Sequence, residues 1–444
     1  MTKPIKSGMR YLYKNLALTA ICILFLLLGS TIVKAANIAD EVTFTATPAS
    51  RGAIFKSGEP VEYNINIINS LPTKEDGKIT YRITDLHGKF LSEDSVKIKL
   101  NANGNKQMLL SMPARTVGFY KINLMINVSD YDDTIRRAFG VDPDKIRSAY
   151  AKPADFDQFW KETKAELATV KPNFKMTEMP DSGKDNRRLY LVEMQSLGNI
   201  TVRAWLTIPI SKNKNKKCTV LLGLPGYQVD LKPGFGDDED VAVMYLNVRG
   251  QGNSRDVIHT DRTGYITYNI DDKNKYVMRG VIMDCIRAID FICTVPQLDK
   301  DKIIITGGSM GGFLAAATAG LDDRVKLFSA QNPILSDIRN LPTDEWPMND
   351  IIRYSKIKPG LTMDKIYSNL DYFDTKNFAP TINSDILVGI GLLDHLAPPE
   401  NEYAFYNNIR KNKKIMVFEN LGHEVPPEYV LYQGRWMRDS FSLF

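Results

Sequence analysis

A serine stands at the centre of a glycine-rich turn, Gly307-Gly308-Ser309-Met310-Gly311-Gly312. An apolar run, residues 303–306, precedes the turn, and a helix-forming run, residues 313–317, follows it. A strand, a sharp turn and a helix form the context of a nucleophile elbow, which lifts a serine hydroxyl out of the sheet edge. Glycines two positions before and after the serine leave room for such a turn to close. We predict that Ser309 is a nucleophile, and the alternative is an ordinary glycine turn.

A serine hydroxyl is protonated at neutral pH, so it needs a base to accept its proton. The chain has four histidines. His87 lies in a turn, His259 in a polar loop ahead of the serine, and His395 beside an acid candidate, whereas His423 directly follows the apolar run 415–418. We therefore predict His423 as the base. The alternative is a solvated loop side chain.

The base needs a carboxylate to hold its tautomer and stabilise its cation. Asp394 follows the apolar run 386–391, and functional residues collect at the carboxyl ends of parallel strands. It also gives the chain order Ser309, Asp394, His423. The alternative for Asp394 is a turn or helix-cap residue.

An acyl-transfer site also needs two N–H donors for the developing oxyanion. The backbone N–H of Met310, directly after the serine, is one candidate. The second is the N–H of Tyr227, in the loop Leu224-Pro225-Gly226-Tyr227 after an early strand. A simple Pro-Gly turn is the alternative.

Two regions of different pattern must position these residues. Short alternating segments, residues 61–67, 79–83 and 120–128, predict strands with one buried face. Turn signals, including Asp76-Gly77 and His87-Gly88, separate them. We predict an immunoglobulin-like β-sandwich over residues 37–142.

From residue 153 to 444 the pattern changes. An amphipathic helix is predicted over residues 155–167. Nearly continuous apolar runs then alternate with helical segments, at residues 219–224, 241–248, 303–305 and 386–390. Strands that are apolar on both faces predict a doubly wound, mostly parallel sheet covered by helices.

The pattern at the start of the chain predicts an export signal. Basic residues at positions 3–14 precede an apolar run, residues 16–28, and Val33-Lys34-Ala35 fits a cleavage site after Ala35. An uncleaved anchor is the alternative. Removing residues 1–35 takes five basic residues from the net charge of +5, and the neutral remainder does not favour nucleic acid as a partner. We expect a periplasmic or extracellular protein that does not associate with the membrane after cleavage.

Three cysteines remain beyond the leader: Cys218, Cys285 and Cys293. An odd number argues against a disulfide framework in an exported protein, and we predict three buried small apolar residues. No Cys and His spacing indicates a zinc site, and we expect no metal or organic cofactor.

Several further segments resemble carbohydrate esterase family seven, the acetyl xylan esterases and cephalosporin C deacetylases. They are 247–254, 264–267 with 270–273, 276 with 279–281, 391–394 with 398–399, and 422–424. The likeness runs from about Pro153 to Phe444. It implies an α/β-hydrolase fold, a catalytic triad of Ser309, Asp394 and His423, and oxyanion positions at Tyr227 and Met310.

The resemblance implies a small acetyl ester, such as an acetylated oligosaccharide, as the substrate. The family usually has a histidine where this chain has Pro225 and a glutamine where it has Met310, so the pocket lining is expected to differ. Hexameric rings are common in the family, and a homo-oligomer is left open here. Two alternative functions stay open: a peptidase similar to the prolyl oligopeptidases, and a non-catalytic carbohydrate-binding protein.

Overall fold

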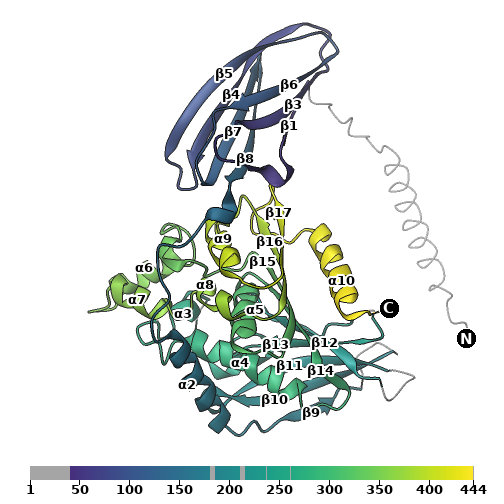
Figure 1. Cartoon of the computed structure of the whole chain (residues 1–444), viewed down its shortest axis with the longest axis vertical. Helices are drawn as coiled ribbons and strands as arrows, with labels where there is room; N and C mark the ends of the chain where they lie inside the picture. Colours follow the sequence, from purple (N-terminus) through teal and green to yellow (C-terminus); the bar gives the residue numbers. More distant parts are fainter. Residues whose placement is uncertain (1–40, 181–185, 211–215, 237, 261, 444) are drawn as a thin grey trace, which may run out of the picture.

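The computed structural model describes residues 41–180, 186–210, 216–236, 238–260 and 262–443. The predicted leader and the first residues of the predicted sandwich lie outside these ranges. Among the helices of the described residues, none combines the length and the apolar character needed to cross a bilayer. The chain forms an elongated molecule with a β-sandwich at one end and an α/β unit at the other (Figure 1).

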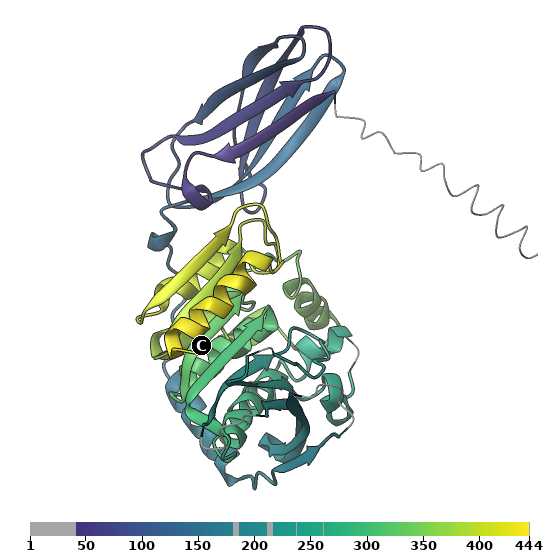
Figure 2. The same cartoon turned by 90° about the vertical axis from the view of Figure 1, so that its right-hand side faces the viewer.

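The sandwich consists of two sheets that stack face to face (Figure 2). Its strands are β1 (Val42–Pro48), β2 (Ile54–Phe55), β3 (Val61–Asn69), β4 (Glu75–Asp85), β5 (Phe90–Leu100), β6 (Gly104–Met112), β7 (Gly118–Val128) and β8 (Tyr131–Val141). One sheet has the order β1-β3-β6 and the other β2-β8-β7-β4-β5. Alternate residues of β3, β4 and β7 are buried between the sheets, as the period-two pattern predicts. This arrangement agrees with the immunoglobulin-like sandwich that we predicted.

The turn predicted at Asp76-Gly77 is wrong, because both residues lie inside β4. Gly77 pairs with Val128 of β7 and Ile98 of β5. A Cβ atom at this position would collide with the carbonyl oxygen of Asn127. The glycine therefore permits close strand packing, a role that sequence does not distinguish from a turn.

The α/β unit is built on a nine-stranded sheet with the order β17-β16-β15-β14-β12-β13-β11-β10-β9. Its strands are β9 (Lys175–Glu178), β10 (Arg187–Ser196), β11 (Ile200–Pro209), β12 (Cys218–Leu224), β13 (Val241–Asn247), β14 (Leu298–Gly308), β15 (Val325–Gln331), β16 (Asp385–Gly391) and β17 (Lys413–Phe418). The strands from β12 to β17 are parallel, and β9, β10 and β11 are antiparallel. The sheet is thus mostly parallel, and only three residues, 197–199, join β10 to β11, too few for a crossover to a parallel strand.

Helices cover both faces of this sheet (Figures 1 and 2). They are α2 (Phe156–Thr169), α3 (Arg262–Thr267), α4 (Val277–Ile292), α5 (Met310–Leu321), α6 (Met348–Ile357), α7 (Met363–Leu370), α8 (Thr375–Phe378), α9 (Pro399–Asn408) and α10 (Pro427–Phe441). In β14, Ile303 and Ile305 belong to the large core under α4 and α5, whereas Ile304 packs with Tyr429 and Trp436 of α10. Burial on both faces explains why β14 reads as a continuous apolar run.

The three cysteines of the described residues are free. Cys218 and Cys285 are buried, as predicted. The prediction for Cys293 is wrong in part, because this residue is half-buried beyond the end of α4, where Arg324 Nη1 lies 3.8 Å from its sulfur.

Candidate active site

Ser309 lies in a strained turn between β14 and α5. Its backbone angles are φ 58° and ψ −121°, and its N–H donates to the carbonyl of Gln331 at 2.8 Å. A Cβ atom at Gly307 would collide with the backbone of Gly311. A Cβ atom at Gly311 would collide with the carbonyl oxygen of Leu224. Both glycines are therefore required for the sharp turn that the sequence predicts.

His423 and Asp394 come from the loops after β17 and β16, and they meet Ser309. The Nε2 atom of His423 lies 2.8 Å from Ser309 Oγ, and its Nδ1 atom lies 2.6 Å from Asp394 Oδ2. A carboxylate can only accept, so Nδ1 carries the proton and Nε2 has the lone pair that can accept from the serine hydroxyl. The three side chains predicted from the sequence thus form one hydrogen-bonded relay.

The carboxyl of Asp394 is fully buried, and both of its oxygens accept hydrogen bonds. Its Oδ1 atom accepts from the backbone N–H groups of Leu396 and Ala397, at 2.8 and 2.9 Å. Its Oδ2 atom is left for His423. An asparagine here would have one acceptor oxygen for these three donors, so the site specifies an aspartate.

The two predicted oxyanion donors lie in loops that touch. The loop after β12, which carries Tyr227, packs on the serine turn through the contact between Gly311 and Leu224. The strand order reverses here, since β13 and β14 lie on opposite sides of β12, and ligands bind at such switch points. Met310 begins α5, where helical N–H groups have no intrahelical acceptor.

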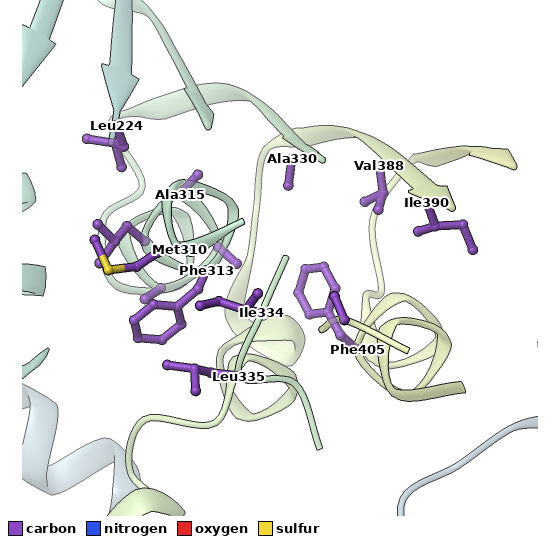
Figure 3. Close-up of a cluster of buried hydrophobic side chains, with 14 of the residues drawn as sticks. Leu224, Met310, Phe313, Ala315, Ala330, Ile334, Leu335, Val388, Ile390 and Phe405 are labelled. Carbon is purple, nitrogen blue, oxygen red and sulfur yellow. The ribbon is translucent and has the colours of Figure 1, made fainter. Parts of the chain in front are cut away.

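Aromatic rings hold the Tyr227 loop in place. The Tyr227 ring lies 4.8 Å from that of Trp346 and 5.8 Å from that of Tyr265, centroid to centroid. Its hydroxyl accepts from the N–H of Ile266 at 3.1 Å. The side chain of Met310 lies beside Phe313 in the hydrophobic layer beneath the site, and the same layer includes Leu224, Ala330, Val388 and Phe405 (Figure 3). Because Met310 is fully buried, its side chain belongs to the hydrophobic core, and its backbone N–H is the part of the residue that could stabilise an oxyanion.

Two residues that support the site were not predicted. Asn332, after β15, accepts from the N–H of Gly391 at 3.2 Å and donates to the carbonyl of Glu424 at 3.0 Å, so it bridges the loops of Asp394 and His423. A Cβ atom at Gly391 would collide with the carbonyl oxygens of Leu421 and Gly422. The dipeptide Asn332-Pro333 after an apolar segment was an available turn signal.

The three histidines that the sequence analysis set aside take no part in this relay. His87 lies in the turn between β4 and β5, and His395, beside Asp394, has its Nε2 atom 4.0 Å from Glu345. His259 lies in the loop ahead of α3.

Comparisons with known proteins identify the family to which the α/β unit is similar. A family model described as acetyl xylan esterase (AXE1) matches residues 143–439. The acetyl esterase Axe7A of Xylanibacter ruminicola is 25% identical over 334 residues, which is 72% of this chain and 74% of that protein. An acetyl xylan esterase from Paenibacillus sp. R4 has a TM-score of 0.61 and 27% identity, covering 67% of this chain and 98% of its own. Acetyl xylan esterase 1 from Thermoanaerobacterium sp. JW/SL YS485 shares the fold, with a TM-score of 0.61 and 24% identity over 67% of this chain and 97% of its own.

Proposed function

This chain belongs to the acetyl xylan esterase family and is a carboxylic ester hydrolase of the α/β-hydrolase fold, and from this premise we propose that it is an exported serine esterase that deacetylates xylo-oligosaccharides or related acetylated sugars. The observation that carries the proposal is the relay from Ser309 through His423 to Asp394. Its geometry is that of a nucleophile, a base and a carboxylate that orients the base. Family membership favours this reading over the peptidase and the non-catalytic binding protein.

In the proposed reaction, Ser309 Oγ attacks the acetyl carbonyl carbon while His423 Nε2 takes the serine proton. The N–H groups of Met310 and Tyr227 stabilise the oxyanion of the tetrahedral intermediate. The bond to the sugar oxygen then breaks, and His423 gives its proton to that oxygen. Water, deprotonated by His423, attacks the acetyl-enzyme, which releases acetate and restores the serine hydroxyl. These steps need no metal ion and no organic cofactor.

We also propose the division of the chain predicted above: a leader of residues 1–35, the sandwich over 37–142 and the hydrolase over 153–444. The match of the family model to residues 143–439 supports the second boundary. Basic residues followed by an apolar run support the leader. Sequencing the amino terminus of the protein recovered outside the cytoplasm should give a start at Ala36, and a start at Met1 or Thr2 would favour the anchor.

Acetate release tests the reaction. The protein and its Ser309→Ala variant are compared on acetylated xylo-oligosaccharides and on a small aryl acetate. We expect activity on both substrates and a loss of about 10³-fold or more in the variant. Ser368→Ala, which removes an exposed serine of α7, is the control and should leave both activities unchanged. Equal activity of the Ser309→Ala variant would exclude the serine mechanism, and activity on the aryl ester alone would exclude the sugar substrate.

A further inference from the structure

A cleft of about 560 Å³ lies where the sandwich meets the hydrolase. The sandwich contributes the β4–β5 turn, Leu86 to Gly88, and Lys121 of β7. The connecting segment contributes Ile146 and Arg147, and the opposite wall comes from residues 337–345 and 394–401 of the hydrolase. Its volume falls in the range of pockets that bind small organic ligands, about 300–1,000 Å³.

The cleft and the candidate active site share two loops. Asp394 lines the cleft and also bonds to His423, so the acid loop forms part of both. Glu345 lines the cleft, and its neighbour Trp346 packs on Tyr227 of the oxyanion loop. The cleft therefore adjoins the loops that position the acid of the relay and the second oxyanion candidate.

The sandwich wall of the cleft is held against the hydrolase by specific contacts. The side-chain amide of Asn407, in α9, donates to the carbonyls of Pro143 and Ile146, at 2.8 and 3.0 Å. The ring of Phe119, in β7, lies 5.4 Å from that of Tyr403 in α9. These contacts fix the orientation of the sandwich, so the cleft is formed before a ligand binds.

The opposite wall is equally well anchored. Asp337 forms an ion pair with the buried Lys376, and Ser148 of the connecting segment donates a hydrogen bond to Asp337. Arg339 forms a bidentate pair with Asp371, at 2.8 and 3.0 Å. Both sides of the cleft are thus built from segments that have little freedom to collapse.

The turn that carries His87 is itself ordered. The N–H of Lys89 donates to Asp85 Oδ1 at 2.9 Å, the N–H of Gly88 donates to the Asp85 carbonyl, and Lys121 Nζ donates to the Leu86 carbonyl at 2.8 Å. His87 is exposed, and its imidazole has no hydrogen bond to another described residue. His87 and Glu400 both line the cleft, one from the sandwich and the other from the hydrolase.

The charges of the cleft favour a neutral ligand rich in hydroxyl groups. Its lining carries both signs of charge, and three of its cations already have hydrogen-bond partners: Lys121 has the Leu86 carbonyl, Arg339 has Asp371, and Arg147 has backbone carbonyls. The carboxyls of Asp344 and Glu400 have no hydrogen-bond partner among the described residues. Unengaged carboxylates accept hydrogen bonds from hydroxyl groups and repel anions.

We propose that this cleft binds the neutral sugar residues that extend from the acetylated residue at Ser309, so that the sandwich helps to select the length of the substrate. The proposal rests on the sugar deacetylase function proposed above. It assigns His87, Asp344 and Glu400 to sugar binding and gives the sandwich a direct part in substrate recognition.

The test compares His87→Trp, whose indole fills the cleft from the sandwich side, with Glu400→Gln, which removes a carboxylate from the other side. Lys89→Trp, two residues further along the same turn and outside the cleft, is the matched control. For each protein, kcat/KM is measured on the aryl acetate and on acetylated xylo-oligosaccharides of one and four residues. We expect both cleft variants to lose about tenfold on the four-residue substrate and to keep wild-type values on the other two. Lys89→Trp should resemble the wild type on all three, and the aryl acetate activity shows that each variant is folded.

Binding supplies a readout that does not depend on turnover. Unacetylated xylotetraose is titrated into the Ser309→Ala protein with and without His87→Trp. We expect xylotetraose to bind to the single variant and not to the double variant.

The outcomes separate the two proposals. If the wild type deacetylates sugars but the cleft variants keep its full activity on the four-residue substrate, the cleft proposal is wrong and the proposed function stands. If the wild type cleaves only the aryl ester, the proposed function is wrong. In that case, the cleft proposal would still be supported if xylotetraose binds to the Ser309→Ala protein and the added His87→Trp substitution prevents this binding. If xylotetraose does not bind, the cleft proposal is wrong.

Discussion

At the residue scale, two carboxyl groups near the end of the sheet contrast in their surroundings. Both Asp394 and Glu402 are buried, but Asp394 accepts three hydrogen bonds, whereas neither oxygen of Glu402 has a hydrogen-bond partner among the described residues. Burial, followed by the negative charge of Asp394, raises the pKa of Glu402 well above its usual value. We infer that Glu402 is a neutral acid in the folded protein, which avoids a second unpaired charge behind Asp394.

This protonation links stability to pH. The folded pKa of Glu402 lies above its unfolded pKa. At a pH below the unfolded pKa, Glu402 is protonated in both states and its ionisation does not affect the free energy of unfolding. As the pH rises from the unfolded pKa through the folded pKa, the free energy of unfolding falls. Glu402→Gln removes the ionisation and should increase the free energy of unfolding at pH 8 by about 1–3 kcal/mol, with a smaller gain at pH 5. Urea denaturation at both pH values measures this difference. Glu428→Gln, at an exposed site in α10, should show no comparable dependence, and an equal effect of Glu402→Gln at both pH values would contradict the assignment.

At the element scale, the ends of β16 and β17 must come together so that Asp394 reaches His423. Gly391 permits this approach, because a Cβ atom there would collide with the carbonyl oxygens of Leu421 and Gly422. Gly391→Ala should push the two loops apart and lower kcat on the aryl acetate by about 100-fold, with a smaller effect on KM, because the base is misplaced for the chemical step.

The control for this substitution is Gly434→Ala in α10, where the new Cβ would have no neighbour closer than 3.8 Å. It should leave kcat unchanged and increase the free energy of unfolding by about 0.5–1 kcal/mol, since alanine favours a helix over glycine. Steady-state kinetics and denaturation of both variants give the comparison. A Gly391→Ala protein with wild-type kcat would show that the loops tolerate separation.

The same loops show which parts of the molecule sequence can predict. Ser309, Asp394 and His423 were predictable because each follows a locally recognisable apolar strand. β10 and β11 were not predicted, because half-polar antiparallel strands lack such continuous runs. Asn332 owes its role to partners distant in the chain and Glu402 owes its raised pKa chiefly to burial, and local pattern carries no signal for either.

At the scale of the whole molecule, the contact between α9 and the connecting segment decides whether the sandwich acts together with the hydrolase. Asn407 supplies two hydrogen bonds across this contact, whereas its neighbour Asn408 makes no hydrogen bond through its side chain to the described residues. Both are at the end of the same helix and are half-buried, so Asn408→Ala is a matched control for Asn407→Ala.

Asn407→Ala removes both hydrogen bonds between α9 and the connecting segment, at a cost of about 1–3 kcal/mol to this contact, although the Pro143 carbonyl keeps the Ile146 N–H and the Ile146 carbonyl keeps Arg147 Nη1 as donors. We expect faster proteolysis of the connecting segment, residues 146–153, and a severalfold lower kcat/KM on long acetylated oligosaccharides, because a loosened sandwich no longer holds its side of the cleft. Activity on the aryl acetate should stay at the wild-type level, since Ser309, Asp394 and His423 all come from the hydrolase. Limited proteolysis and kinetics on both substrates test this, with Asn408→Ala unchanged in each. If Asn407→Ala instead lowers kcat/KM on the aryl acetate and on the oligosaccharide by the same factor, the sandwich supports the catalytic loops themselves. A contribution of the cleft would lower only the activity on the long substrate, because the aryl acetate does not reach the cleft.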